Sequence, residues 1–513
     1  MTPSQQNVLE TQHITKRFGH LVANDDISIA LKKGEILAIL GENGAGKTTL
    51  MNILFGLYRP TSGAIRLHGA EVSFRSPREA IAAGLGMVHQ HFMLVPPLTV
   101  TQNIILGQEP VKNGRILYDK ARKEVLELSK RFGLEIDPDA RVMDLPVGLQ
   151  QRVEILKALY RKASVLILDE PTAVLSPREV EELFDVLKKL AASGTSIIII
   201  THKLEEALSI ANRVYVLRRG KLVAEMDASR ATPQELANQM VGRPVVLAVE
   251  KPEPHNTTTV PILKLDKLCV RSQRGLPALV NVDLSIHRGE ILGIAGVEGN
   301  GQDELCKAVM GLCSIESGSI RYKDKNITHW NSRRRIEAGM GYIPEDRHSS
   351  GLVLPFTLSE NLILGKSDKP PLCRYGILDK GEIDSNATRL MQQYDIRAER
   401  PATVVSTLSG GNQQKVVVAR EFSRNPDFLL ISQPTRGLDV GAIEYIYKKI
   451  NELKVQGVGI LLISMELEEI FALADRIAVL HKGEVVFESP AQATSQTEVG
   501  EYMFRGKLAR RAQ

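Results

Sequence analysis

One stretch constrains this chain more than any other: residues 41–48 read Gly-Glu-Asn-Gly-Ala-Gly-Lys-Thr. An apolar run typical of a strand precedes it at 36–40, and a run typical of a helix follows it from Thr49 to Leu57. Glycines let the backbone curl so that successive N–H groups point at a phosphate chain. The positive end of the following helix adds to the attraction. The stretch therefore predicts a phosphate-binding loop between a strand and a helix.

Two side chains at the end of this loop carry its chemistry. Lys47 supplies a cation for the outer phosphates of a nucleotide, and the Thr48 hydroxyl is placed to ligate Mg²⁺. A chance glycine-rich turn is the alternative, but it does not account for the strand, the spacing, the lysine and the threonine together. We therefore assign nucleotide binding to Gly41, Glu42, Asn43, Gly44, Ala45, Gly46, Lys47, Thr48 and Thr49.

Length and composition limit the possible classes of protein. At 513 residues the chain is too long for one ordinary core. A formal net charge of +5, from 65 basic and 60 acidic residues, gives no electrostatic reason to expect a nucleic-acid partner. The polar stretch 1–12 lacks the apolar core of a signal peptide, and no apolar run approaches the ~18–20 residues of a membrane span. Work at a membrane would require the spans of another chain.

The plan of the first half recurs in the second. Residues 296–301 echo 41–46 at an offset of 255, and residues 428–432 echo 165–169 at an offset of 263. One modest insertion between these positions explains the difference. A Pro- and Thr-containing stretch with little periodicity separates the two copies and indicates a linker. We expect a tandem duplication with a first domain at 8–243, a linker at 244–260 and a second domain at 261–506.

The first half also suggests its own elements. Two strands are expected within 9–29, on either side of 16–19, and a hairpin at 63–74. The pattern is helical from about 99 to 160. Val165-Leu166-Ile167-Leu168 has the continuous apolar character of a strand buried on both faces.

A signature motif places these features in a known family. Residues 408–414 read Leu-Ser-Gly-Gly-Asn-Gln-Gln, close to L-S-G-G-Q, and the chain resembles ATP-binding-cassette proteins with two nucleotide-binding domains fused in one polypeptide. It is similar in particular to the ATPases of bacterial simple-sugar and nucleoside importers. Residues 341–347 (Gly-Tyr-Ile-Pro-Glu-Asp-Arg) and 433–439 (Gln-Pro-Thr-Arg-Gly-Leu-Asp) are typical of their second halves. Residues 86–95 favour the nucleoside branch.

The resemblance implies an α/β fold of two tandem P-loop NTPase domains. Each is expected to contain a mixed core sheet, an antiparallel β-subdomain and an α-helical subdomain. ATP and Mg²⁺ are the expected cofactors.

The chemistry of phosphoryl transfer assigns two acids after the buried strand of the first half. Attack of water on the γ-phosphate requires charge neutralisation, a metal and an oriented water. Asp169 ends the strand and is suited to hold the metal. Glu170 comes next and would polarise the attacking water as general base. An exposed strand end without function is the alternative, and the phosphate loop upstream disfavours it.

The family resemblance adds two further residues, and the position of a third, Phe18, some twenty residues before the loop, suggests another contact. Gln90 is implied to ligate the metal and to link the metal and the water to a membrane partner. His202 is implied to touch the γ-phosphate. Phe18 either stacks on adenine or belongs to the core.

The second half has lost its catalytic residues. Its phosphate loop has exchanged a cation for an anion, and a carboxylate ~4 Å from a phosphate oxygen costs on the order of 4 kcal/mol per charge pair at a dielectric of 20. We expect no hydrolysis there. The first-half residues and their counterparts are Lys47 and Gln302, Thr48 and Asp303, Gln90 and Glu345, Asp169 and Ser432, Glu170 and Gln433, and His202 and Met465.

The signatures show the opposite pattern. Ser409, Gly410 and Gly411 of the second half can bind an anion at a helix N-terminus. In the first half Pro146 has neither hydroxyl nor N–H, and Val147 places a branched side chain where glycine allows close approach. Proline is tolerated in the first turn of a helix, so the helix is expected to survive.

Head-to-tail pairing, as in ATP-binding cassettes, would place every intact element in one composite site. Each phosphate loop then faces the other half's signature, and every degraded element falls into the second site. We expect one hydrolytic site and one degenerate site.

The sequence thus favours the cytoplasmic motor of an importer, peripheral to the inner membrane. Two integral membrane permease subunits and an extracytoplasmic solute-binding lipoprotein are the expected partners, without nucleic acid. One alternative is a soluble tandem-cassette ATPase that acts on ribosomes, but such proteins carry two working sites and a long charged linker. A DNA-repair cassette ATPase would need zinc-type cysteine spacing, and no C-x-x-C pair occurs among Cys269, Cys306, Cys313 and Cys373.

Overall fold

The computed structural model describes residues 6–89, 92–172, 175, 177–245, 260–272 and 274–506. The chain divides into two compact units: the first holds residues up to Val245 together with Asp439–Gly441, and the second holds the remainder. The sequence-predicted Gln90, most of the predicted linker and the end of the C-terminal tail lie outside the described residues.

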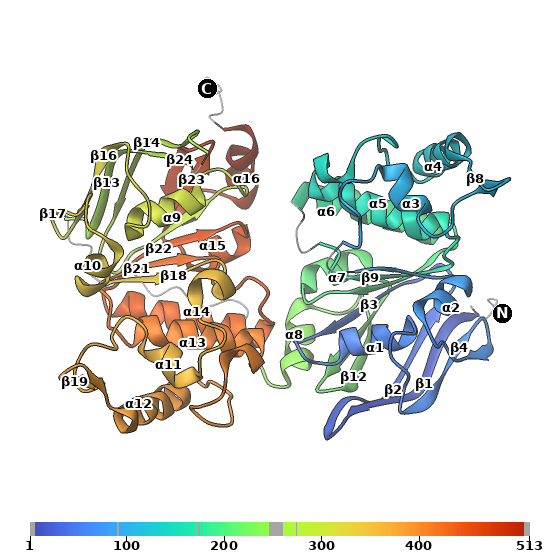
Figure 1. Ribbon diagram of the computed structural model, residues 1–513, viewed down its shortest axis with the longest axis horizontal. Helices are drawn as coiled ribbons and strands as arrows, with labels where there is room; N and C mark the ends of the chain where they lie inside the picture. The colour runs from blue at the N-terminus through green and yellow to red at the C-terminus, as the bar shows by residue number, and fades with distance from the viewer. Residues whose placement is uncertain are drawn as a thin grey trace. The chain divides into compact units, whose positions relative to one another are not determined.

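The first unit is built on a six-stranded sheet in the order β12-β11-β3-β10-β9-β6 (Figure 1). Five neighbouring strands run parallel, and only the edge strand β12 is antiparallel. The central strands are buried along their whole length, which explains their continuous apolar sequences. The strands are β3 (Ile36–Gly41), β6 (Leu85–Val88), β9 (Val165–Asp169), β10 (Ser196–Ile200), β11 (Arg213–Arg218) and β12 (Lys221–Asp227).

A second, antiparallel sheet in the order β2-β1-β4-β5 belongs to the same unit. Its strands are β1 (Asn7–Phe18), β2 (Leu21–Lys32), β4 (Ser62–Leu67) and β5 (Ala70–Val72). The predicted break at 16–19 was wrong, because β1 continues through Phe18 and the chain turns only after it. Leu50 and Met51 of the helix α1 (Lys47–Leu54) are buried in the apolar cluster that joins this sheet to the core sheet.

Helices cover the opposite face of the core sheet. α3 (Val100–Ile105), α4 (Tyr118–Phe132), α5 (Val147–Tyr160) and α6 (Pro177–Ala192) pack with strand residues such as Leu166 and Leu168 in one cluster (Figure 1). A short hairpin, β7 (Val111–Lys112) and β8 (Arg115–Ile116), stands between α3 and α4. The remaining helices of this unit are α2 (Pro77–Ala82), α7 (Leu204–Ile210) and α8 (Pro233–Val241). The three expected parts, a mixed core sheet, an antiparallel sheet and a helical layer, are all present.

The second unit repeats this architecture strand for strand. Its core sheet has the order β18-β21-β22-β15-β23-β24, and its antiparallel sheet has the order β14-β13-β16-β17. The core strands are β15 (Ile291–Ala295), β18 (Met340–Ile343), β21 (Phe428–Ser432), β22 (Gly459–Ser464), β23 (Arg476–His481) and β24 (Glu484–Pro490). The antiparallel strands are β13 (Leu263–Arg271), β14 (Pro277–Ile286), β16 (Ser317–Tyr322) and β17 (Lys325–Asn326), and β19 (Cys373–Arg374) and β20 (Ile377–Leu378) form a separate hairpin.

The helices of the second unit also match those of the first. They are α9 (Gln302–Met310), α10 (Ser332–Glu337), α11 (Leu358–Ile363), α12 (Lys380–Gln393), α13 (Gly410–Phe422), α14 (Val440–Val455), α15 (Leu467–Leu473) and α16 (Gln496–Arg505). Both halves therefore fold as the duplication predicts.

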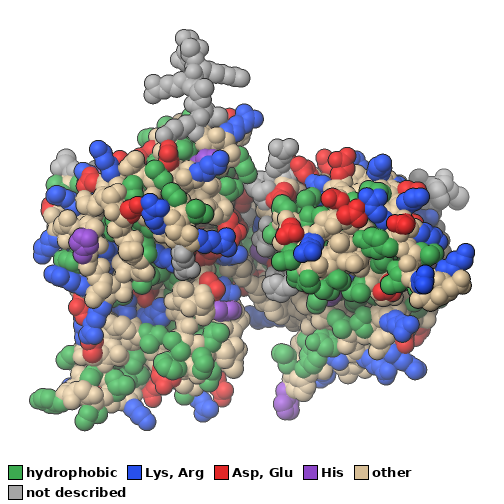
Figure 2. Space-filling view, turned by 45° about the horizontal axis from the view of Figure 1, so that its top comes forward, with side chains coloured by type: hydrophobic (Ala, Val, Ile, Leu, Met, Phe, Trp, Pro, Cys, Tyr) green, Lys and Arg blue, Asp and Glu red, His purple; other side chains and the backbone are tan. Residues whose placement is uncertain are grey.

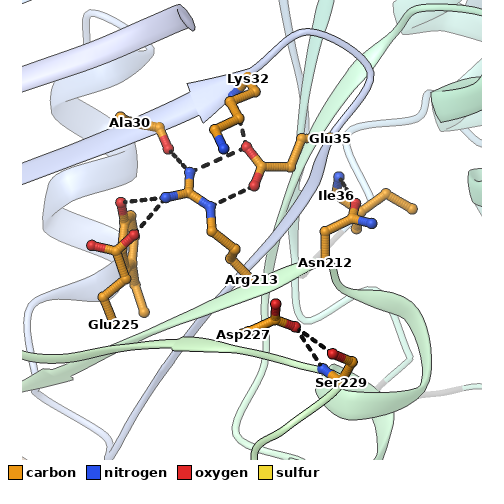
Figure 3. Close-up of polar contacts among 10 residues, drawn as sticks. Ala30, Lys32, Glu35, Ile36, Asn212, Arg213, Glu225, Asp227 and Ser229 are labelled. Carbon is orange, nitrogen blue, oxygen red and sulfur yellow. Dashed lines mark hydrogen bonds and ion pairs between the residues drawn. The ribbon is translucent and has the colours of Figure 1, made fainter. Parts of the chain in front are cut away.

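An arginine fastens the two sheets of the first unit together. Arg213, on β11, reaches Glu35 through Nε at 2.6 Å and donates from Nη2 to the carbonyl oxygen of Ala30 at 2.5 Å (Figure 3). Its Nη1 pairs with Glu225 at 2.5 Å. Because Glu35 directly precedes β3, this cluster fixes the strand that leads into the phosphate loop.

The same cluster recurs in the second unit. Arg476 pairs with Glu290 and Glu488 and donates to the carbonyl oxygen of Ser285. These partners stand at the duplicated positions of Glu35, Glu225 and Ala30. The support of the phosphate loop has thus been kept in both halves, although the loop chemistry has not.

Surface charge is mixed. Figure 2 shows Lys and Arg side chains interspersed with Asp and Glu side chains on the visible face of each unit. Among the residues that the structure describes, no helix is both long enough and apolar enough to cross a membrane.

Candidate functional site: the phosphate loops and strand ends

The first phosphate loop joins β3 to α1, and its glycines are required by close backbone contacts. A Cβ on Gly41 would lie 2.5 Å from the carbonyl oxygen of Leu217. Gly46 has a φ of 100°, and a Cβ there would lie 2.4 Å from the carbonyl oxygen of Ala23. Asn24, which is fully buried, donates from Nδ2 to the carbonyl oxygen of Gly46 at 3.0 Å. The loop is therefore held against β2 and β11.

Lys47 is buried at the start of α1 and folds back over its own loop. Its Nζ donates to the carbonyl oxygens of Gly41 at 2.6 Å and Glu42 at 3.1 Å. Burial lowers the pKa of the ammonium, while the charges of Glu170 and Asp169 act in the opposite direction. A desolvated cation at this point gains strongly from an incoming phosphate.

The other loop residues line the same turn. Asn43, Gly44 and Thr48 are exposed, Glu42 and Thr49 are half-buried, and Ala45 is buried. Thr48 is the second residue of α1, so its exposed side chain lies at the amino end of this helix.

The two acids and the histidine come together at neighbouring strand ends. β9 and β10 are parallel and place Asp169 opposite Ile200, so the residues that follow each strand lie at the same edge. Glu170 has a φ of 47°, in the left-handed region, and its N–H donates to the carbonyl oxygen of Ile200 at 2.9 Å. His202 Nδ1 lies 2.9 Å from Glu170 Oε1. The fold thus aims Glu170 at His202 at the cost of backbone strain.

The pKa values of the two acids move apart. Burial and the charge of Glu170 raise the pKa of Asp169 to about 6, with Lys47 opposing. Burial also raises the pKa of Glu170, but the hydrogen bond and charge of His202, together with Lys47, outweigh it and hold that pKa below its ordinary value. Divergent acids of this kind are common where one must stay ionised to accept a proton.

The oxygen donors of the site fit Mg²⁺. Asp169 and Thr48 offer one carboxylate and one hydroxyl, and Mg²⁺ prefers few protein oxygens, with waters and phosphates completing its octahedron. No cluster of three or more His, Cys, Asp or Glu side chains suited to a metal occurs within the described ranges. A metal here would accordingly depend on the nucleotide for its remaining ligands.

Phe18 lies at the surface, so the core alternative was wrong. Its side chain is 42% exposed and meets Tyr58 edge to face, with ring centroids 5.3 Å apart. Lys16 Nζ stands 5.0 Å from the centre of the Phe18 ring. Stacking on adenine stays a prediction.

The second phosphate loop keeps its shape without the cation. Gln302 Nε2 donates to the carbonyl oxygen of Val297 at 2.9 Å, which repeats one of the bonds that Lys47 makes in the first loop. Asp303 is paired with Lys307 Nζ at 2.5 Å one helical turn further on. The anion that the sequence adds to this loop is therefore partly neutralised within α9.

The strand ends of the second unit keep the backbone and lose the acids. Gln433 has a φ of 45°, and its N–H donates to the carbonyl oxygen of Ile463 at 2.8 Å, as Glu170 does in the first unit. Ser432 hydrogen-bonds the buried thiol of Cys306. Glu345, the counterpart of Gln90, pairs with Arg436. Because Gln433 stands at the position of Glu170, this edge lacks the residue that is assigned as the base in the first unit.

The two signature helices differ at their first residues. Ser409 precedes α13 with a φ of −63°, and Pro146 precedes α5 with a φ of −55°. In both helices the residue at this position accepts a backbone hydrogen bond from within the helix. The proline of the first half thus preserves the helix, as expected, and removes only the hydroxyl and N–H.

The sequence did not indicate that in each unit a glutamate accepts a hydrogen bond from the threonine that follows a core strand. Glu206 of the first unit is half-buried, and Glu469 of the second is buried. Thr172 donates to Glu206 at 2.5 Å, and Lys203 Nζ lies 3.1 Å from the same carboxylate. In the second unit Thr435 donates to Glu469 at 2.8 Å, but Glu466 replaces the lysine. One sequence signal could have shown this difference between the units. The segments 202–206 (H-K-L-E-E) and 465–469 (M-E-L-E-E) correspond, and the lysine of the first is a glutamate in the second.

We expect Glu469→Gln to stabilise the second unit above neutral pH. Burial raises the pKa of Glu469 to about 7, against an ordinary value of about 4.3. The folded state therefore binds the proton more tightly, and the stability of the natural protein falls as pH rises from about 4 to about 7. Glutamine does not titrate, so its advantage should be largest above pH 7, on the order of 4 kcal/mol, and should fade toward pH 4. Denaturant unfolding at pH 5 and pH 8 measures it.

The matched control is Glu206→Gln, which removes the partner of Lys203. Its stability should fall or stay level at pH 8. A gain for Glu469→Gln of equal size at both pH values would contradict the assigned ionisation.

Both units have the fold of P-loop nucleotide-binding domains, and in the first unit Glu170 lies 2.9 Å from His202 while Glu170 and Asp169 act electrostatically on Lys47. The protein-family model described as ABC transporter matches residues 24–173 and 279–436 of this chain. The nucleoside import ATP-binding protein NupA of Lactococcus lactis subsp. cremoris is 48% identical over 98% of this chain and 99% of its own length. The guanosine import ATP-binding protein NupO of Bacillus subtilis is 49% identical, with 96% of each chain covered.

A sugar-related member of the family is more distant. The ribose import ATP-binding protein RbsA 1 of Rubrobacter xylanophilus is 39% identical over 96% of this chain and 97% of its own length. The chain therefore belongs to the ABC transporter family, and it is an ATP-binding ATPase with two fused domains of that family.

Proposed function

We propose that this protein is the ATP-hydrolysing subunit of a bacterial importer, and that the imported solute is a nucleoside rather than a simple sugar. The choice of solute is supported by the relatives at 48% and 49% identity, which are named for nucleoside and guanosine import, against 39% for the ribose protein. The solute would not contact this chain, so the sequence of the ATPase subunit gives only indirect information about which solute is imported.

One observation carries the catalytic proposal: intact and degraded elements sort between the halves. The first unit supplies Lys47, Asp169, Glu170 and His202 but has Pro146 at its signature. The second unit has the reverse combination. Independent decay would not sort in this way, whereas head-to-tail pairing of the halves, as the family does it, gathers every intact element in one site.

In that site each group has one task. The backbone N–H groups of the Lys47 loop and the amino end of α13 hold the phosphates from two sides. Thr48, Asp169 and Gln90 would hold Mg²⁺, which would neutralise phosphate charge when bound. Glu170 accepts a proton from the attacking water, and His202 holds that carboxylate and the γ-phosphate in place. Ser409, Gly410 and Gly411 contribute only when the γ-phosphate is present.

Transport follows from this dependence on the γ-phosphate. ATP stabilises the closed arrangement of the two halves, and hydrolysis removes the bridging group and lets them part. Two integral membrane permease subunits would follow this cycle at the cytoplasmic face of the inner membrane. An extracytoplasmic solute-binding lipoprotein would select the solute.

Uptake in cells tests the function. Deletion of the gene should abolish uptake of labelled guanosine, the natural chain should restore it, and Glu170→Gln should not. Loss of labelled ribose uptake instead would move the assignment to the sugar branch. Co-purification with ribosomes rather than with membrane subunits would contradict the importer altogether.

A further prediction concerns the degenerate site. We expect Gln302→Lys to leave ATP turnover of the full chain unchanged, because Ser432 and Gln433 still provide neither metal ligand nor base. Lysine can make the same bond to the Val297 carbonyl oxygen as Gln302 does, so folding should be unaffected. Steady-state phosphate release measures turnover, and a clear rise would show that the second site is latent rather than lost.

A further inference from the structure

An arginine lies against the amino end of the second unit's signature helix. A Cβ on Gly410 would stand 2.8 Å from Arg347 Nη2, so the guanidinium packs directly on the Cα of this glycine. Arg347 Nη1 donates to the carbonyl oxygen of Arg436 at 3.2 Å. The contact lies wholly within the second unit.

This position is electrostatically unfavourable for a cation unless an anion joins it. α13 spans 13 residues, its first turn has no acidic residue, and Ser409 makes no side-chain cap to the helix backbone. The Ser409 hydroxyl instead accepts a bond from Asn412 Nδ2 at 3.0 Å. A cation at the positive end of a helix costs about 0.3–1 kcal/mol. The helix end and the guanidinium together form an electropositive corner.

The guanidinium also retains unused donor capacity. Arg347 Nε is buried and has no hydrogen-bond partner among the described residues. Burial lowers the pKa of Arg347, with Asp346 opposing. That carboxylate accepts the N–H groups of His348 and Ser349. A desolvated, incompletely bonded guanidinium is well suited to a phosphate, which it binds through two parallel N–H bonds.

The first half shows that this arginine accompanies the intact signature. The two halves differ in length here, since the offset is 255 at Gln90 and Glu345 but 258 at Thr99 and Thr357, and residues 89–99 of the first half contain no arginine or lysine. This segment belongs to the half whose signature contains Pro146 and Val147. The cation is therefore present only where the helix end is still able to bind an anion.

We propose that Arg347 is a further phosphate-binding residue of the working site, where it contacts the γ-phosphate of the ATP held by the Lys47 loop. The proposal rests on the proposed function, since it requires the second unit's signature to face that loop. Arg347 acts in the triphosphate state alone, because a diphosphate does not extend to the signature. It therefore adds to the discrimination of ATP from ADP.

Binding by the purified full-length chain tests the proposal. In a Glu170→Gln background, which keeps ATP unhydrolysed, the dissociation constants of Mg-ATP and Mg-ADP are compared for Arg347→Ala, Arg347→Phe and Arg347→Lys. Bonds to charged groups are worth about 1.5–3 kcal/mol, so Arg347→Ala should weaken ATP about 10–150-fold and leave ADP unchanged. Arg347→Lys should recover part of the loss, and Arg347→Phe, which is large but uncharged, should not.

A matched control separates recognition from folding. Arg321→Ala removes an exposed arginine from β16 of the same unit and should change neither affinity. Thermal unfolding without nucleotide should be the same for all variants. Unchanged ATP affinity of Arg347→Ala, equal weakening of ATP and ADP, or a lowered melting temperature would overturn the proposal. Failure of the proposed function itself would appear differently, as ATP binding that survives Lys47→Ala.

Discussion

Glu170→Gln is expected to lower the ATP turnover number by about 10²–10⁴-fold while leaving ATP binding intact. The carboxylate is ionised at neutral pH, because His202 and Lys47 hold its pKa below the ordinary value. An ionised carboxylate can accept the proton of the attacking water, and an amide cannot. Glutamine matches glutamate in size, so the loss would report the missing base rather than a change of shape. Phosphate release and equilibrium nucleotide binding measure the two effects separately.

The second half provides the control for this substitution. Gln433→Glu restores a carboxylate at the same left-handed backbone position, where φ is 45°. It should not raise turnover, since Gln302 and Ser432 still leave that loop without a cation and a metal ligand. Near-normal turnover by Glu170→Gln would mean that another group removes the proton, and the assigned mechanism would be wrong.

The sequence predicted those parts of the fold that depend on local patterns. The glycine spacing and the flanking runs specify the strand, loop and helix around Lys47, and the duplicated offsets specify that the second unit repeats the first. Asp169 and Glu170 could be placed at a strand end because continuous apolar runs mark buried parallel strands. Their proximity to His202 follows from strand order, which the family resemblance implied and the residues alone did not.

Other parts of the site depend on contacts that no local pattern contains. The sequence shows that Gln302 and Asp303 replace Lys47 and Thr48, but not that the amide bonds the loop carbonyl or that Lys307 neutralises Asp303. Arg347 stands far along the chain from Gly410, so its place at the signature helix emerges only from the packing of the second unit.

The ionisation of Glu469 depends in the same way on tertiary contacts. Its pKa follows from burial beside Thr435, a residue of the turn after another strand. From the sequence alone, Glu469 would be assigned the ordinary pKa of an exposed glutamate. The sequence shows that Lys203 near Glu206 is replaced by Glu466, but the deeper burial of Glu469 is seen only in the fold.

Exchange of the second signature for the first should abolish turnover without unfolding the helix. The double variant Ser409→Pro with Gly410→Val introduces into the second signature the residues that the first half has at Pro146 and Val147. Ser409 already has a φ of −63°, which proline adopts without strain, and its carbonyl oxygen remains available to the helix. What disappears is the hydroxyl, one N–H and the space in which Arg347 packs. Loss of a single preorganised donor costs about 10²–10³-fold in turnover, so at least this much is expected.

The reciprocal double variant, Pro146→Ser with Val147→Gly, repairs a signature that faces no working loop under head-to-tail pairing. It should leave turnover unchanged, because the phosphate loop opposite it has Gln302 in place of lysine. Both variants change the same two positions of equivalent helices, so any general effect on folding would appear in both. If the repaired first signature raised turnover, or the damaged second one left it intact, the working site could not be assembled from Lys47 and Ser409. A large loss in one variant alone is the outcome that a single composite site requires.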